Sequence, residues 1–377
     1  MRRASSLLAA LIGFLLAVRG LAAWHGRDAD ALFDGELEAQ RERARAMDAW
    51  TGADLDRGDF STGAARFDGE WLFVTRLMAV LGYAQTALEH PELRAEHAAR
   101  IDESLDAMLA PEARAFDREA WGRDALSDLG GARDHVGYLG YLSLALAVAR
   151  AVSPTSRHVE MEERVMRHLV QRASANELGL LETYPGEVYP TDNTTFFGAI
   201  GVHDAVTGED HGALRARLSR SLETRYRDPR TGLLYQRVDP DDGAPLDGPR
   251  GSGTALAAYF LSFSDGALSL ALYRSLRAGM LTRTLGFGTA REYPAASGGW
   301  GDVDSGPVIL GQGVSATGFV IGLARAHGDR ETFRAHLATA SFFGGPVDGR
   351  HALGGPLGDA LLFALTTALP PSRWEAR

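Results

Sequence analysis

The strongest constraint on the fold is a weak internal repeat. Several times the chain passes through a loop rich in Gly, Pro and Asp and then enters a helix-length run of small apolar residues. The entries lie near Asp68, His135, Asp192, Gly251, Asp304 and Gly358, at intervals of 53 to 67 residues. An interval of about 55 residues accommodates one helical hairpin with its loops. Such a period is typical of an array of helical pairs.

Each repeat pairs an apolar helix with a charged one. The apolar member, as in ALAAYFLSF, is hydrophobic all round and is therefore expected to be buried on every side. The charged member, as in RARLSRSLETRY, has one face suited to solvent. We predict an all-α (α/α)6 toroid, a single domain over residues 23–377 with six small-residue inner helices. An open helical solenoid is the alternative, and residues 233–238 are the best candidate for a strand.

Composition excludes several kinds of chemistry. The net charge of −10 gives the surface no general attraction for nucleic acid or anionic lipid. The chain has no cysteine, so disulfides, thiolate nucleophiles, iron–sulfur clusters and cysteine-ligated zinc are ruled out. We therefore expect a small-molecule substrate as the partner, no nucleic acid, and membrane contact only through the N-terminal segment.

The N-terminus carries a targeting signal. Arg2 and Arg3 precede an apolar run over residues 7–18, which is short for a membrane span but suits an export signal. Small residues before Ala22 predict cleavage after it, so that residues 1–22 are the signal. Arg19 lies close to that position, which leaves an uncleaved anchor open. The expected location is the periplasm, either free or anchored to the inner membrane by residues 7–18.

Polar and aromatic residues are densest in the loops before the inner helices. If every inner helix starts at the same end of the ring, these loops converge there. The candidate catalytic residues are Asp192, His135, Tyr189, Glu187 and Asp304. The candidate substrate-binding residues are Asp68, Tyr138, Tyr184, Asn193, Arg250, Tyr293, Trp300 and Asp302. The alternative for Asp192, Asp304 and Ser305 is helix capping, which is common for these residue types.

No metal or cofactor is expected. The motifs HExxH, GxSxG and the P-loop are absent, and the alternating aspartates at Asp302 and Asp304 match only a fragment of a calcium loop. Ligands from distant loops nevertheless remain possible. Most other histidines are expected at the surface: His90, His97, His158, His168, His203, His211, His327 and His336. The place of His351 stays undecided.

The segment YPGEVYPTDN, from Tyr184 to Asn193, follows the His135 helix and resembles the bacterial linalool dehydratase/isomerase family. The resemblance implies an exported (α/α)6 barrel that interconverts isoprenoid alcohols and dienes by acid–base chemistry without a cofactor. The family places cysteines at the positions of Thr183 and Asp192, which is a departure. His135 matches its pocket histidine, and Asp68 its early aspartate.

Three functions follow as hypotheses. The first is a lyase/isomerase on a small isoprenoid-like alcohol, in which Asp192 protonates the leaving hydroxyl and Tyr189 or His135 takes a proton from carbon. The second is a glycosidase or polysaccharide-modifying enzyme, which pairs two carboxylates and here uses Asp304 with Glu187 or Asp192. In that case Trp300 and Tyr293 would stack on sugar rings. The third is a non-catalytic envelope protein that binds a ligand or partner.

Overall fold

The protein folds as a closed ring of helical hairpins. The computed structural model describes residues 2–52, 55–295, 297–303, 305–347, 350–351 and 354–375. The inner helices are α4 (Ala65–Glu89), α7 (Tyr141–Val152), α9 (Pro190–Thr207), α11 (Gly251–Leu261), α13 (Val314–Ala326) and α15 (Gly355–Thr366). Each packs on the next in this order, and α15 packs back on α4. The predicted (α/α)6 toroid is thus confirmed, and the open solenoid is wrong.

A second ring of helices covers the first. Its members are α3 (Leu37–Thr51), α5 (Arg94–Leu109), α8 (Val159–Ala175), α10 (Gly212–Thr224), α12 (Gly266–Gly279) and α14 (Arg330–Gly344). Asp265 and Asp329 cap α12 and α14 through the backbone N–H groups of Leu268 and Thr332. These outer helices bury one face against the inner ring, while the inner helices are buried almost throughout.

Small residues let the inner helices approach closely. A Cβ atom added at Gly82 would lie 2.4 Å from the ring of Phe363 on α15. Added at Gly198, it would lie 2.6 Å from the carbonyl oxygen of Phe260 on α11, and added at Gly322, 2.6 Å from Leu365. Cβ atoms do not approach other atoms that closely. The abundance of glycine in these helices is therefore a packing requirement of the narrow ring.

Short elements fill the loops. They include the helices α2 (Ala29–Phe33), α6 (Ala115–Trp121) and α16 (Ser372–Glu375), and single turns over Arg57–Asp59, Pro91–Leu93 and Ala125–Ser127. A π-helical segment, Val136–Gly140, leads into α7. Four antiparallel hairpins pair β1 (Tyr235–Val238) with β2 (Pro245–Pro249), β3 (Leu281–Thr284) with β4 (Phe287–Ala290), β5 (Val308–Ile309) with β6 (Gln312–Gly313), and β7 (Pro346–Val347) with β8 (Arg350–His351). Strand β1 lies inside the one stretch predicted as a strand.

One inner helix begins later than predicted. The sequence places the fifth start near Asp304, but α13 begins at Val314. The residues between form the β5–β6 hairpin, in which Leu310 and Gly311 adopt positive φ angles of 52° and 81°. Such a turn ends the apolar run that the sequence presents as a continuous helix. Asp304 itself lies outside the described residues.

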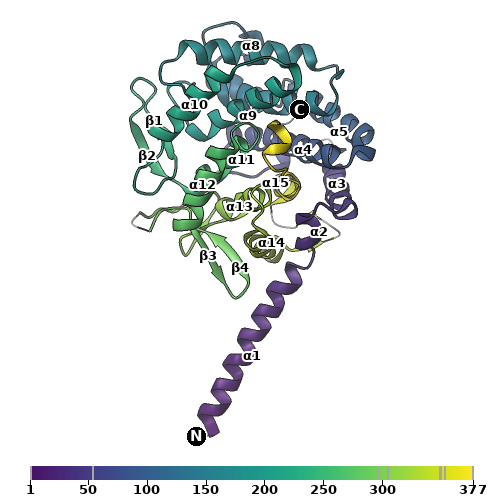
Figure 1. The fold of residues 1–377 in the computed structure, drawn as a ribbon, viewed down its shortest axis with the longest axis vertical. Helices are drawn as coiled ribbons and strands as arrows, with labels where there is room; N and C mark the ends of the chain where they lie inside the picture. Colours follow the sequence, from purple (N-terminus) through teal and green to yellow (C-terminus); the bar gives the residue numbers. More distant parts are fainter. Residues whose placement is uncertain are drawn as a thin grey trace.

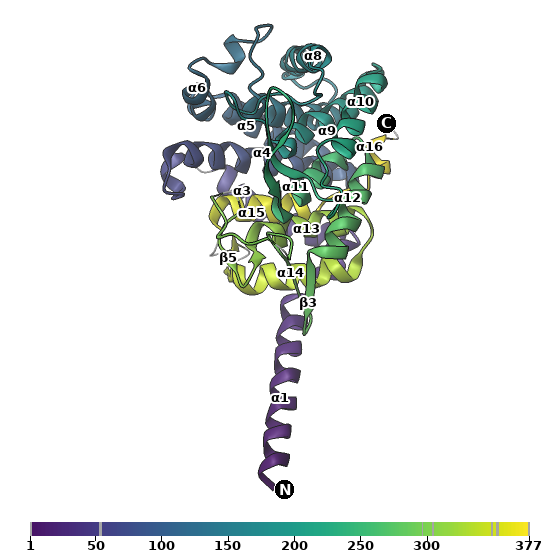
Figure 2. The same ribbon diagram turned by 90° about the vertical axis from the view of Figure 1, so that its left-hand side faces the viewer.

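The N-terminal helix α1 (Arg2–His25) projects from the body as a lone helix (Figure 1). Its span Ser5–His25 has a mean hydropathy of 2.1 and is long and apolar enough to cross a membrane. The span Arg66–Glu89 passes the same test but is the buried core helix α4. Only the last residues of α1 touch the body, where they pack on α14. Figure 2 shows α6 and β5 on one side of the ring and α10 and α16 on the other.

Candidate functional site

The starts of the inner helices meet at one end of the ring, which we call the mouth. The hydroxyl of Thr191 on α9 donates to the carbonyl oxygen of Gly253 on α11 at 3.1 Å. The hydroxyl of Tyr184, ahead of α9, donates to Oε2 of Glu70 on α4 at 2.9 Å. The N–H of Gly251 at the start of α11 donates to the carbonyl of Glu292 at 2.8 Å. Loops that are distant in the sequence therefore lie together here, as the repeat predicts.

Asp192 lies in the first turn of α9 and faces neighbouring elements of the mouth. The hydroxyl of Tyr141 on α7 donates to its Oδ1 at 2.7 Å, and the hydroxyl of Thr183 also lies close to the carboxylate. Burial raises the pKa of Asp192 to about 6, although the two hydroxyls oppose that rise. The residue that precedes the helix is Tyr189, and no side chain caps it. The capping alternative for Asp192 is therefore wrong.

The loop before α9 is held by Asn193. The side-chain oxygen of Asn193 accepts from the N–H of Leu181 at 2.8 Å, and its amide group donates to the carbonyls of Leu181 and Tyr189 at 3.0 and 3.1 Å. Asn193 is fully buried, and these bonds use its hydrogen-bonding capacity. Its place in the fold is that of a positioning residue for the loop rather than a contact for a ligand.

Two tyrosines of this loop pair with acids. The guanidinium of Arg66 lies 3.5 Å from the ring centre of Tyr184, whose hydroxyl bonds Glu70. Burial and the charge of Glu70 raise the pKa of Tyr184 well above its usual range. The hydroxyl of Tyr189 donates to Oε2 of Glu187 at 3.3 Å. Burial also raises the pKa of Tyr189, so both phenols stay protonated at neutral pH.

Glu292 is a second buried acid at the mouth, and the sequence analysis missed it. The hydroxyl of Ser252 on α11 donates to its Oε1 at 2.6 Å, while its Oε2 makes no hydrogen bond among the described residues. Burial raises the pKa of Glu292 to about 7, against the lowering effects of Ser252 and Arg250. A signal was present in the sequence. Glu292 precedes a Tyr-Pro pair, as Glu182 and Glu187 nearly do.

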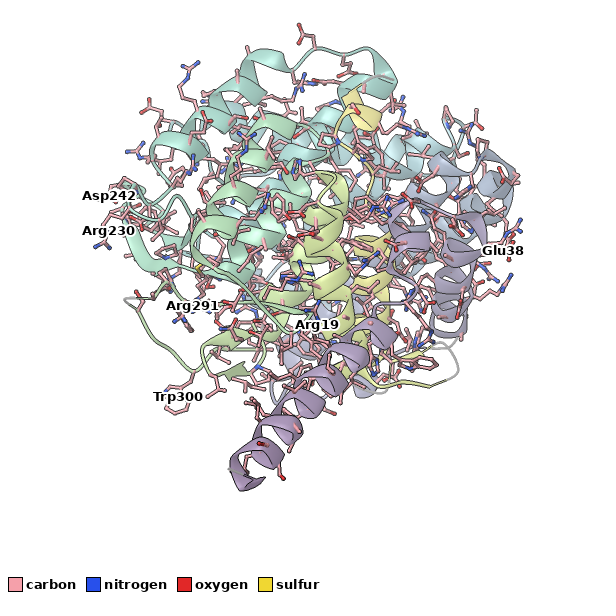
Figure 3. All side chains as sticks on the ribbon, turned by 60° about the horizontal axis from the view of Figure 1, so that its bottom comes forward. Arg19, Glu38, Arg230, Asp242, Arg291 and Trp300 are labelled. Atoms are coloured by element: carbon pink, nitrogen blue, oxygen red, sulfur yellow. The ribbon has the colours of Figure 1, made fainter. Side chains whose placement is uncertain are left out.

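The loop over residues 291–303 forms the rim beside Glu292. Asp302 makes an ion pair with Arg250, which lies 5.6 Å from the ring centre of Tyr293. Trp300 is 94% exposed and points away from the body (Figure 3). Asp302 also exchanges hydrogen bonds with Ser305, whose N–H it accepts at 3.0 Å. These two residues therefore stabilise a loop turn, and Ser305 caps no described helix.

Three other candidates lie apart from the Asp192 cluster. His135 is fully buried, with Nδ1 2.7 Å from Asp117 Oδ2 and Nε2 3.5 Å from Asp128 Oδ2. Its φ of 51° is unusual for a residue other than glycine, and Trp121 packs on its ring. The hydroxyl of buried Tyr138 donates to the carbonyl of Met108. Asp68 accepts from the backbone and hydroxyl of Thr62. We find no contact between these side chains and Asp192 among the described residues.

The mouth is rich in buried polar atoms without a hydrogen bond. In the described part of the chain these include Arg66 Nε, Gln236 Oε1, Glu292 Oε2 and Gln312 Oε1. They belong to α4, β1, the 291–303 loop and β6. Most buried polar groups in proteins are paired, and each exception calls for water, an ion or a ligand. These four unpaired atoms therefore support the mouth as the candidate binding site.

The expectation that most histidines lie at the surface is wrong for His97, His158, His168, His203 and His336, which are buried. Outer helices press their inner faces on the ring, and imidazole nitrogens can satisfy backbone groups there. For example, His97 Nδ1 lies 3.3 Å from the carbonyl of Tyr83. His351 is also buried and pairs with Asp359 at 2.7 Å.

Neither a protein-family model nor a curated protein sequence matches the chain. Solved structures with a similar fold include sugar-processing enzymes. A family 105 glycoside hydrolase from C. acetobutylicum superposes with a TM-score of 0.54 at 12% identity, covering 87% of this chain and 98% of its own. An unsaturated glucuronyl hydrolase specific for heparin gives 0.53 at 11%, covering 92% and 97%.

A third structure is an inactive variant of a family 76 α-1,6-mannanase from Salegentibacter in complex with α-1,6-mannotriose. It gives a TM-score of 0.53 at 10% identity, covering 91% of this chain and 99% of its own. At such identities the similarity establishes the toroid class alone. The likeness to the linalool dehydratase/isomerase family therefore extends to this class of fold, and the reaction is a separate question.

Proposed function

We propose that the protein is a glycoside hydrolase whose acid–base pair is Glu292 and Asp192. The observation that carries the proposal is that both carboxyl groups lie at the mouth with pKa values raised to about 7 and about 6. Glycosidases of most families need two carboxyl groups in different protonation states across the scissile bond. The residues Thr191 and Gly253, adjacent to Asp192 and Ser252, join the two helix starts that carry or contact these acids.

The surroundings of the two acids assign the roles. Tyr141 donates a hydrogen bond to Asp192 that favours its ionised form. Burial favours the protonated form of Glu292 and raises its pKa to about 7. Glu292 is then the acid that protonates the glycosidic oxygen, and Asp192 is the base or nucleophile. The sequence-based glycosidase hypothesis instead paired Asp304 with Glu187 or Asp192, and the acid role of Asp192 belonged to the lyase hypothesis.

The polar character of the mouth supports a sugar more than a hydrocarbon. Its unpaired atoms include a donor on Arg66 and acceptors on Gln236, Glu292 and Gln312, which match the hydroxyl groups of a pyranose. Tyr293 on the rim offers a ring on which a sugar face can stack. Asp192 does not cap its helix, so its carboxylate has no capping role that would account for it in a non-catalytic protein.

The experiment is a substrate panel. The purified protein is incubated with α- and β-linked oligosaccharides, including uronic-acid-containing ones, and the products are measured by mass. We expect cleavage of at least one glycosidic linkage by the wild type and not by Glu292→Gln. Proton NMR of the first product gives the anomer, which separates retention from inversion. A complete absence of cleavage across the panel would count against the proposal.

A second candidate rests on one specific observation. Thr183 and Asp192, which match the cysteine positions of the linalool dehydratase/isomerase family, lie side by side in the structure. Tyr141 beside them packs edge-on against Phe260 at 5.8 Å, so apolar surface is close. A lyase or isomerase on an isoprenoid alcohol would use the same Asp192. Adding terpenols to the panel distinguishes the two, because diene formation without sugar cleavage favours this candidate.

We propose further that α1 stays attached as a membrane anchor. Ala22, after which cleavage was predicted, is buried, and Gly26 packs against Ala338 on α14. The remainder of α1 exposes large apolar side chains, among them Leu7, Phe14 and Leu16. Mass spectrometry of the protein extracted from membranes tests this proposal, because the molecular mass shows whether residues 1–22 are still attached. An intact N-terminus is expected, and a chain beginning at Ala23 would show that the segment is a cleaved signal.

A further inference from the structure

We propose that the protein binds a zinc ion between His203, Glu209 and His211, at the end of the ring opposite the mouth. His203 lies near the end of α9, and the other two residues lie in the loop that leads to α10. One potential ligand atom from each residue lies within 4.8 Å of the others. Nothing in the proposed hydrolase chemistry uses these residues.

The spacing suits a tetrahedral ion. Oε2 of Glu209 lies 3.3 Å from Nε2 of His203 and 3.9 Å from Nε2 of His211. A zinc ion with bonds of about 2.0–2.1 Å holds neighbouring ligand atoms roughly 3.3–3.4 Å apart. Glu209 is 59% exposed, so its side chain is free to make the small adjustment. Two imidazoles and one carboxylate leave a fourth position for water.

The two histidines are oriented as zinc ligands are. Nδ1 of His203 lies 2.5 Å from Oε1 of buried Glu162, and Nδ1 of His211 lies 2.6 Å from Oδ1 of buried Asp204. Each carboxylate fixes the proton on Nδ1, so that Nε2 presents its lone pair to the common point. Carboxylate–histidine–metal triads of this kind are the usual outer arrangement of zinc sites.

The carboxylates are themselves braced. Glu162 Oε2 accepts from Arg150 at 2.8 Å, and Asp204 Oδ2 lies 3.2 Å from Arg215 Nε. Such support keeps the imidazole rings in place before an ion arrives.

The buried nitrogen of His203 faces the proposed ion position. His203 is 2% exposed, and its Nε2 lies 3.3 Å from Oε2 of Glu209, a separation at which a zinc ion can bridge the two atoms. The two nitrogens and one carboxylate oxygen favour a borderline ion such as Zn²⁺ over Ca²⁺ or Mg²⁺, which prefer all-oxygen sites. Binding would tie the end of α9 to the start of α10.

The test is a calorimetric titration of ZnCl₂ into the full, untagged chain in detergent after treatment with EDTA. We expect one zinc ion per chain, and no comparable heat with CaCl₂ or MgCl₂. Glu209→Gln should weaken binding at least 10-fold, because it removes a charged ligand at an exposed position. Asp204→Asn should weaken it 10- to 100-fold through the orientation of His211.

The matched control is Glu223→Gln, an exposed acid on α10 that should leave the affinity unchanged. Circular dichroism in EDTA establishes that each variant is folded. Two outcomes overturn the proposal: no binding by the wild type, or equal affinity in the wild type and the folded Glu209→Gln variant. The mouth variant Asp192→Asn should keep its zinc, which separates this site from the proposed hydrolase activity.

Discussion

The two ends of the ring differ in how their buried polar side chains are paired. At the mouth, Gln236 Oε1, Glu292 Oε2 and Gln312 Oε1 are left without hydrogen bonds among the described residues. At the opposite end, Gln85 donates to the carbonyl of Ala364 and the hydroxyl of Thr367, and Tyr259 donates to Gln85. In this second network the protein itself supplies the hydrogen-bond partners, which the three acceptors at the mouth lack.

Arg325 shows how the opposite end is stabilised. Its buried guanidinium donates to the carbonyls of Leu32 and Ala368 and pairs with Glu89 at 2.8 Å. Beyond it the chain ends in α16, where Trp374 packs on Phe263 with ring centres 4.7 Å apart. Both ends of the ring are built from the same helical hairpins. What distinguishes a structural cluster of buried polar groups from a functional one is whether the protein itself supplies their hydrogen-bond partners.

The largest expected effect concerns the two acids at the mouth. Asp192→Asn and Glu292→Gln should each lower turnover by roughly 10²- to 10⁴-fold, the usual contribution of a general acid or base. The assay uses whichever substrate the panel identifies. Asp241→Asn, an exposed aspartate in the β1–β2 turn, is the control and should keep full activity. Unchanged turnover in both mouth variants would show that the mouth does not differ from the opposite end in catalytic function.

The next effect concerns stability at the opposite end. Arg325→Leu removes the cation that pairs with Glu89, which keeps the hydrogen bond from Gln40. It should lower the free energy of unfolding by about 3 kcal/mol, the lower part of the range because Glu89 is partly exposed. Urea denaturation of the detergent-solubilised protein measures it. The control Arg230→Leu removes an arginine whose side chain is 89% exposed and should change stability by less than about 0.5 kcal/mol. Equal losses in the two variants would contradict the structural role of Arg325.

The fold was predictable because its signal is periodic. Small-residue runs every 55 residues or so are a direct consequence of packing six helices around a narrow axis, and four of the six helix starts fall within three residues of the prediction. Helix α7 starts six residues after His135, because the π-helical segment Val136–Gly140 precedes it. The fifth start, at Val314, was missed because the β5–β6 residues are apolar and continuous with the helix. Local patterns cannot distinguish such a hairpin from a helical turn.

The site was only partly predictable, because it depends on contacts between distant loops. Asp192 and its neighbours were predicted because acids and tyrosines are crowded in the short Tyr-Pro loop. Glu292 acquires its raised pKa from burial beneath elements 40 residues away, as the contact with Ser252 shows. His135 attracted attention as a histidine at a helix start, yet Asp117 and Asp128 enclose its ring. For both Glu292 and His135, burial and contacts with residues distant in the sequence determine what the side chain can do.

The raised pKa of Asp192 should make the free energy of unfolding depend moderately on pH. Its folded-state pKa is raised from 3.8 to about 6, so the folded state holds the proton more tightly than the unfolded state does. The penalty for ionisation is absent below pH 4, grows as the pH rises from about 4 to 6, and is constant above. Asp192→Asn should therefore gain about 3 kcal/mol over the wild type at pH 7 and less than about 1 kcal/mol at pH 4. Urea denaturation at both pH values tests this, and a pH-independent difference would contradict the raised pKa.

The smallest effect concerns the rim. Trp300→Ala should raise KM a few-fold, if the ring stacks on a sugar, with kcat little changed. Because Trp300 is almost fully exposed, its removal should change the free energy of unfolding by less than about 0.5 kcal/mol. Steady-state kinetics and urea denaturation measure the two quantities. An unchanged KM would restrict the binding surface to the residues nearer Asp192 and Glu292.

The most direct measurement is the pH dependence of kcat/KM for the wild type and the two mouth variants. We expect a bell-shaped profile with its maximum between pH 6 and 7, because activity needs Asp192 ionised and Glu292 protonated. In the residual activity, Asp192→Asn should lose the acidic limb and Glu292→Gln the alkaline limb. Survival of both limbs in both variants would show that other groups carry the proton transfers and would contradict the central claim.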